Sequence, residues 1–153
     1  MCASFYLRCK VKKEYFQKLF RLAEKAFDEN EVPVSAIIVK NDKIIGSGRN
    51  QQNKTNKISK HAEINAIENA IARGHKYELS DAILYVSLEP CLMCLGAIIE
   101  AQIKKVVYVL DSPKDGCLKY VNQEKILRKV KIEKTEFTNP YGELLKNFFI
   151  DKR

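Results

Sequence analysis

The sequence lacks the features that mark several large classes of protein. No apolar run approaches the roughly 20 residues that a membrane-spanning helix needs. The N-terminus has no apolar stretch of secretory length, so we predict no signal peptide. No internal repeat, linker or low-complexity segment is present, and 153 residues suit one domain around one core. These absences argue against membrane, secreted and repeat proteins, and we expect a cytoplasmic globular protein.

Cysteine is present, but not in the pattern of a disulfide framework. The count of 5 is odd and the spacing is irregular. Cys91 and Cys94 form a C-x-x-C pair, which together with free thiols fits a reducing cytosol. We expect Cys2, Cys9 and Cys117 to be incidental thiols, because unliganded cysteine behaves as a small hydrophobic residue.

Charge of one sign is in excess. The formal net charge is +8, because 27 lysines and arginines outnumber 19 acidic residues. Such an excess favours a polyanionic partner, most simply nucleic acid. A biased genome composition is an alternative source, since lysine greatly outnumbers arginine, and isoleucine and asparagine are abundant. Charge alone does not decide between these two origins.

The spacing of apolar residues predicts alternating helices and strands. We expect helices at 12–27, 61–73, 91–101 and 141–150, and strands at 34–39, 43–48, 82–87, 105–110 and around 130–132. Asn41-Asp42 marks a hairpin turn, and the polar segment 50–60 is expected to be a loop. Strand, helix and strand in succession imply a parallel crossover. The sequence therefore predicts one α/β domain at residues 13–153, with a mixed sheet and helices on both faces, after an N-terminal extension at residues 1–12 that is disordered in part.

Three residues form a candidate metal site. Zinc prefers nitrogen and sulfur ligands in tetrahedral geometry, and His61, Cys91 and Cys94 supply them. The other histidine, His75, follows His61 along the same predicted helix, which at about 1.5 Å per residue places it roughly 20 Å away. Three protein ligands with one open position for water are the pattern of a catalytic zinc site.

Both halves of this site open a predicted helix. Helix N-termini carry unpaired N–H groups and partial positive charge, which lowers the pKa of a thiol. Cys91 and Cys94 share one helix face, and Pro90 before them favours a helix start.

Glu63 lies two residues after His61. A carboxylate there could take a proton from a water molecule at the metal and pass it to a leaving amine. The alternatives are a glutamate favoured only by the dipole of a helix start and a purely structural zinc site. The H-x-E spacing, Pro90 and the missing fourth ligand favour the catalytic role.

Together these motifs read H-x-E…P-C-x-x-C, the signature of zinc-dependent nucleobase deaminases. Beyond them, the chain resembles the bacterial tRNA-specific adenosine deaminases, which convert wobble adenosine to inosine, from about Tyr15 to Phe149. The matching stretches are Glu31-Val32-Pro33-Val34, Gly48-Arg49-Asn50, His61-Ala62-Glu63, Leu84-Tyr85-Val86-Ser87-Leu88-Glu89-Pro90-Cys91 and Cys94-Leu95-Gly96-Ala97-Ile98-Ile99. The metal motif marks the whole cytidine-deaminase-like superfamily, and the first and fourth stretches narrow the resemblance to its tRNA-editing branch.

The resemblance implies a fold, a metal and an assembly. The fold is a three-layer α/β/α arrangement of the cytidine-deaminase type around a mixed five-stranded sheet. One zinc ion per chain would be bound by His61, Cys91 and Cys94, with Glu63 as the catalytic proton shuttle. The resemblance also implies a homodimer and no organic cofactor.

The resemblance further implies contacts to the anticodon stem-loop of a tRNA. Asn50 would hydrogen-bond a flipped base, Val34 would pack in its pocket, and the C-terminal helix near Phe148 would lie beside the loop. From the residues alone, Asn50 is more typical of a turn. The chain departs from the family pattern at Ile58-Ser59-Lys60, Gly116-Cys117-Leu118-Lys119-Tyr120 and Ala101-Gln102-Ile103. The first two departures fall where RNA contacts are expected.

The leading interpretation is therefore a hydrolytic deaminase acting on wobble adenosine. A free nucleobase deaminase of the guanine or cytosine type is the enzyme alternative. The stretch 94–97 supports it, because it also resembles the guanine deaminases. Val34 argues against it, because guanine deaminases tend to carry an aromatic residue at this position. A basic RNA-binding module with structural zinc is the third interpretation, and it gives Glu63 no use. Basic side chains at 54–60 and 125–134 are candidates for phosphate contact, or are solvated faces.

Overall fold

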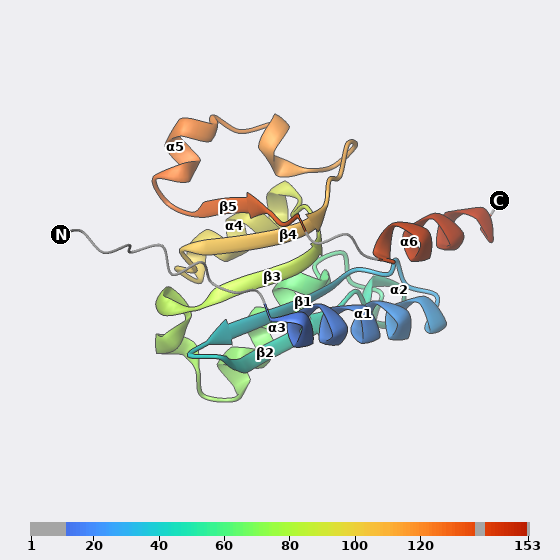
Figure 1. The fold of residues 1–153 in the computed structure, drawn as a ribbon, viewed down its shortest axis with the longest axis horizontal. Coiled ribbons are helices and arrows are strands. Elements are labelled where there is room, and N and C mark those ends of the chain that lie inside the picture. Colours follow the sequence, from blue (N-terminus) through green and yellow to red (C-terminus); the bar gives the residue numbers. More distant parts are fainter. Residues whose placement is uncertain (1–11, 137–139, 153) are drawn as a thin grey trace.

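A mixed five-stranded sheet forms the centre of the molecule (Figure 1). The computed structural model describes residues 12–136 and 140–152, so the extension expected at 1–12 lies, apart from Lys12, outside the described residues. The strands are β1 (Ser35–Lys40), β2 (Lys43–Arg49), β3 (Ile83–Leu88), β4 (Lys105–Leu110) and β5 (Lys131–Lys134), in the spatial order β2-β1-β3-β4-β5. β1 pairs antiparallel with β2 and β3, whereas β4 pairs parallel with β3 and β5. The predicted change from antiparallel to parallel pairing is confirmed.

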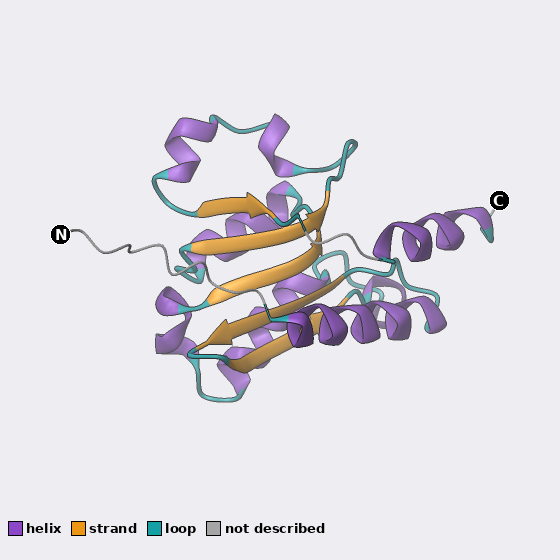
Figure 2. Cartoon of the chain, viewed as in Figure 1, coloured by secondary structure: helices purple, strands orange, loops and turns teal. Residues whose placement is uncertain are grey.

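The helices lie on both faces of this sheet (Figure 2). They are α1 (Lys13–Asp28), α2 (Gln52–Thr55), α3 (Ala62–Ala72), α4 (Leu92–Glu100), α5 (Gln123–Leu127) and α6 (Tyr141–Ile150), with 3₁₀ turns at Lys76–Asp81 and Cys117–Lys119. The four longer helices were predicted; α2, α5 and the 3₁₀ turns were not, and α2 occupies the segment expected to be a loop. In the described part of the chain, no helix combines the length and apolar character needed to cross a membrane.

Two cores flank the sheet, because successive side chains of a strand point to opposite faces. Along β1, Ala36 and Ile38 join the core under α3 and α4, whereas Ile37 and Val39 join the core under α1 and α6. Strands covered on both faces read as continuous apolar runs, which is why β1, β3 and β4 lack polar alternation. The three-layer α/β/α architecture follows from this double burial.

Two glycines of β2 let α3 approach the sheet unusually closely. A Cβ at Gly48 would lie 2.4 Å from the carbonyl oxygen of Ala62, and one at Gly46 would lie 2.6 Å from that of Ala66. Only small side chains fit between these elements, so alanines form the face of α3 that packs on β2. Ile71, expected on the apolar face of this helix, is instead 41% exposed. The first turn of α3, which follows His61, is therefore fixed directly against β2.

Candidate active site

The functional residues gather where three strands end at one edge of the sheet. β1 runs antiparallel to β2 and β3, and β4 runs parallel to β3, so β2, β3 and β4 present their carboxyl ends at the same edge. β2 leads into Asn50, β3 leads into Cys91 and β4 leads into Asp111. His61 and Cys91 are the residues immediately before α3 and α4. The structure thus brings together two helix N-termini, as the sequence predicted.

His61, Cys91 and Cys94 are close enough to share one metal ion. The Nδ1 atom of His61 lies 3.6 Å from the Sγ atom of Cys91 and 3.4 Å from that of Cys94. Tetrahedral bonds of the usual zinc lengths would separate such nitrogen and sulfur atoms by about 3.6 Å. Among residues 12–136 and 140–152, no second cluster of three or more histidine, cysteine or acidic side chains has comparable spacing. The donor set and its separations fit a zinc ion.

The electrostatics of the three ligands favour charge on one sulfur. Hydrogen bonds from the thiol of Cys94 and from His61 lower the pKa of Cys91 to about 4. Donation to Cys91, together with burial, raises the pKa of Cys94. The hydrogen bond to Cys91 also raises the pKa of His61. Cys91 therefore offers a thiolate, the form of cysteine that binds metals.

Glu63 is the buried carboxyl group of the site. It lies in the first turn of α3, is only 3% exposed and lines the same pocket as His61 and Cys91. Burial raises the pKa of its carboxyl, since the charged form is disfavoured away from water. A carboxyl group whose pKa is raised accepts a proton more readily than an exposed carboxylate does, which suits a group that transfers protons.

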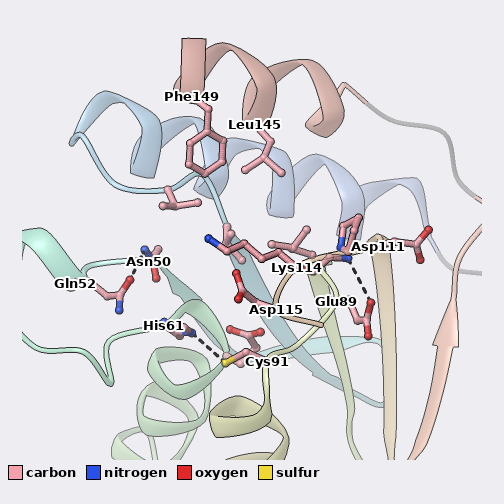
Figure 3. Close-up of a pocket in the computed structure, with 16 residues that line it drawn as sticks. Asn50, Gln52, His61, Glu89, Cys91, Asp111, Lys114, Asp115, Leu145 and Phe149 are labelled. Carbon is pink, nitrogen blue, oxygen red and sulfur yellow. Dashed lines mark hydrogen bonds between the residues drawn. The ribbon is translucent and has the colours of Figure 1, made fainter. Parts of the chain in front are cut away.

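The pocket itself is a cavity of about 410 Å³ above these residues (Figure 3). Its lining includes Val32, Val34, Asn50, Gln52, Leu88, Glu89 and residues 111–115. Leu145 and Phe149 of α6 reach over it. Val34 and Asn50, both named from the sequence, lie in the pocket wall; Asn50 is only 5% exposed.

Phe148 does not line this pocket. It is buried against α1, where its ring centroid lies 6.0 Å from that of Phe27, and it contacts Phe149 edge-on at 5.5 Å. Phe149 is the aromatic residue of α6 that lines the cavity, with 53% of it exposed. Packing on α1 sets this rotation of α6, so Phe149 and not Phe148 lines the cavity. The expected position of the C-terminal helix beside the anticodon loop stays a prediction.

Sequence reasoning also missed how the wall at residues 111–115 is held. The carboxylate of Glu89 accepts hydrogen bonds from the backbone N–H groups of Ser112 at 3.3 Å and Leu118 at 3.0 Å. Gly116 closes on this carboxylate so tightly that a Cβ there would lie 2.4 Å from it. Glu89 lies in a stretch that matches the family, so the sequence marked the residue as important. Its hydrogen bonds to the 111–118 segment could not be predicted from that match. Lys114 and Asp115, which this loop brings to the pocket, had no sequence signal.

The two predicted basic stretches differ in their relation to the pocket. No residue of either stretch lines the pocket, but 54–60 lies in the chain between the pocket residues Gln52 and His61. Ion pairs join Lys54 to Glu29, Lys60 to Glu68, Arg128 to Glu124, Lys131 to Glu133 and Lys134 to Asp111. The segment 54–60 is therefore the better placed of the two for a ligand that enters the pocket.

The chain is similar to known deaminases in sequence and in fold. The family model of the MafB19-like deaminases matches residues 11–153. A tRNA-specific adenosine deaminase of Buchnera aphidicola subsp. Schizaphis graminum is 40% identical over 145 residues, which are 91% of this chain and 95% of the relative. A solved structure from a study of A-to-I editing by tRNA:A34 deaminases has a TM-score of 0.79 at 28% identity and covers 88% of this chain and 100% of its own. A guanine deaminase from Nitrosomonas europaea shares the fold, with a TM-score of 0.76 at 21% identity over 88% of this chain and 82% of its own.

Proposed function

Because this chain belongs to the MafB19-like deaminase family, we propose that it is a hydrolytic deaminase that converts the wobble adenosine of a tRNA anticodon to inosine and releases ammonia. One observation carries the proposal. His61, Cys91 and Cys94 converge beside the buried Glu63 in one pocket, in a chain that is 40% identical to a tRNA-specific adenosine deaminase over 95% of that relative.

The proposed cofactor is one zinc ion per chain, held by Nδ1 of His61 and the Sγ atoms of Cys91 and Cys94. When bound, the ion supplies a Lewis acid that activates a water molecule for attack on the base. The remaining chemistry belongs to side chains. The thiolate of Cys91 brings negative charge to the ligand set, and the two helix N-termini stabilise that charge.

Glu63 is the proposed proton shuttle. One carboxylate oxygen accepts a proton from the attacking water, and the carboxyl group then delivers a proton to the departing amino group. The reaction balances, since adenosine and water give inosine and ammonia. The buried setting of Glu63 supports this role, because it raises the pKa of the carboxyl group and so favours its accepting a proton.

The substrate contacts form the finer part of the proposal. Asn50 hydrogen-bonds the base and Val34 packs against it, since both lie in the pocket wall. Phe149 offers a partly exposed ring on which a neighbouring base of the loop can stack. Flipping out a base costs less free energy in a loop than in a duplex, which favours an anticodon loop over a paired region as the substrate.

The proposed assembly is a homodimer. Each chain forms a single domain that spans residues 13–153. Because the proposed substrate is a tRNA, the proposed location is the cytoplasm. Leu92 and Met93, on the first turn of α4, leave 49% and 38% of their surfaces exposed and offer apolar area for a partner. Sedimentation equilibrium of the purified protein tests the dimer.

Mass analysis of nucleosides tests the reaction. Zinc-loaded protein is incubated separately with an arginine-type anticodon stem-loop, free adenosine, guanine and cytosine. We expect inosine in the stem-loop and little product from the other three. Guanine or cytosine consumed as fast as the stem-loop adenosine would instead indicate a free nucleobase deaminase.

A further inference from the structure

Gln52 is a pocket residue to which the proposed reaction assigns no role. It is the first residue of α2 and lies beside Asn50 (Figure 3). Its Nε2 donates to the backbone carbonyl of Ile58 at 2.9 Å, and its Oε1 accepts from Nδ2 of Asn50 at 3.4 Å. The two ends of one amide thus link the backbone of the 50–60 segment to the residue proposed to contact the base.

The carbonyl of Ile58 decides which way round both amides lie. A carbonyl oxygen can only accept, so Gln52 must turn its NH₂ group to Ile58 and its oxygen to Asn50. Asn50 must then turn its own NH₂ group to Gln52, which leaves its Oδ1 on the opposite side. The two orientations of an asparagine amide have nearly the same shape and differ in their hydrogen bonds, so Gln52 selects between them.

The helix that carries Gln52 is anchored although it is only four residues long. The backbone N–H of Lys54 donates at 2.7 Å to the carboxylate of Glu31, which is completely buried. Gln51, at the N-cap position, makes no side-chain capping bond, so Glu31 does for α2 what a capping side chain does for other helices. Gln52 is therefore presented by a fixed element.

We infer that Gln52 is a positioning residue, which orients the amide of Asn50 so that its carbonyl oxygen is offered to an amino group of the bound base. Adenine carries such a group, and its N–H bonds donate to an acceptor. The inference rests on the proposed function and adds to it a way of selecting bases by their hydrogen-bond donors.

The test uses a Glu63→Ala background, in which a stem-loop can bind without being converted. Dissociation constants are measured for two RNA stem-loops that differ only at the target position, which holds adenine or purine, the same base without its amino group. Gln52→Met keeps the length of the side chain and removes both hydrogen bonds. Gln52→Glu keeps an acceptor for Asn50 and removes the donor to Ile58. Gln51→Met is the control at the neighbouring position.

We expect Gln52→Met to weaken binding of the adenine loop about five-fold, the worth of one neutral hydrogen bond, and to leave binding of the purine loop unchanged. Gln52→Glu should recover most of the loss, and Gln51→Met should bind both loops as the background protein does. Equal weakening for both loops, or for neither, would overturn the inference. So would a Gln52→Glu variant as weak as Gln52→Met. A separate assay of inosine formation by the chain with native Glu63 and Gln52 distinguishes failure of the proposed function, which shows there as no product.

Discussion

Replacing Gly48 by alanine is expected to push α3 away from β2 and to disturb the metal site with it. The added Cβ would lie 2.4 Å from the carbonyl oxygen of Ala62 and 2.5 Å from the backbone nitrogen of Ala66. Ordinary contact begins about 1 Å farther out. Both neighbours are helix backbone, which cannot rotate aside as a side chain can. Overpacking of this kind costs about 1–3 kcal/mol of unfolding free energy.

The displacement of α3 should also weaken zinc binding, because α3 begins directly after His61 and carries Glu63 in its first turn. Urea unfolding followed by circular dichroism measures the stability, and elemental analysis measures the zinc content. Gly142→Ala is the control: nothing lies within 4 Å of a Cβ at that position of α6, so alanine should stabilise the protein by about 0.5–1 kcal/mol. A Gly48→Ala protein with wild-type stability and a full complement of zinc would refute the reasoning.

Three further changes test the metal ligands, an ion pair and the RNA substrate. Cys91→Ser should lose its zinc, whereas Cys117→Ser, at a buried thiol outside the three-ligand group, should keep it; elemental analysis compares the two. The hydrogen bond and charge of Arg49 lower the pKa of Glu29 below its usual 4.5. The ion pair therefore adds stability above pH 4.5, and this stability is lost as the pH falls through the lowered pKa of the folded protein. Glu29→Gln should therefore lower stability at neutral pH and flatten its loss on acidification, in urea titrations across that range. Affinity for the stem-loop should fall steeply as salt is added, because bound phosphates release counterions, and a flat response in a binding titration would contradict an RNA substrate.

The elements that the sequence predicted best are those with strong local periodicity. β4 and α6 have the bounds expected for them, 105–110 and 141–150, because apolar spacing is clear along their whole length. The hairpin turn was also recognisable, since Asn41 and Asp42 tolerate the positive φ angles of 48° and 62° that they adopt. α2 could not be predicted, because the carboxylate of Glu31 that caps it comes from the segment before β1.

The same distinction holds in the site. The three candidate metal ligands were found from residue type and spacing, and the structure places them within reach of one ion. The pocket-facing side of α6 could not be found that way, since Leu145, Phe148 and Phe149 are all apolar. The rotation of the helix is fixed by its packing on α1, through Phe148 on Phe27 and Tyr141 on Phe20. The role of Gln52 depends on the carbonyl of Ile58, whose position follows from the folded path of 50–60.

The central claim is that this site hydrolyses an adenine in RNA while Glu63 moves the proton. The most direct measurement is a reaction in ¹⁸O-labelled water with an anticodon stem-loop, followed by mass analysis of the nucleosides, for zinc-loaded wild-type protein and for Glu63→Gln of equal zinc content. We predict inosine that carries the heavy oxygen from the wild-type protein, and from Glu63→Gln a rate below about a tenth of the wild-type kcat, which corresponds to about 1.4 kcal/mol of barrier. Inosine without the label, or label incorporated by Glu63→Gln at the wild-type rate, would contradict the claim.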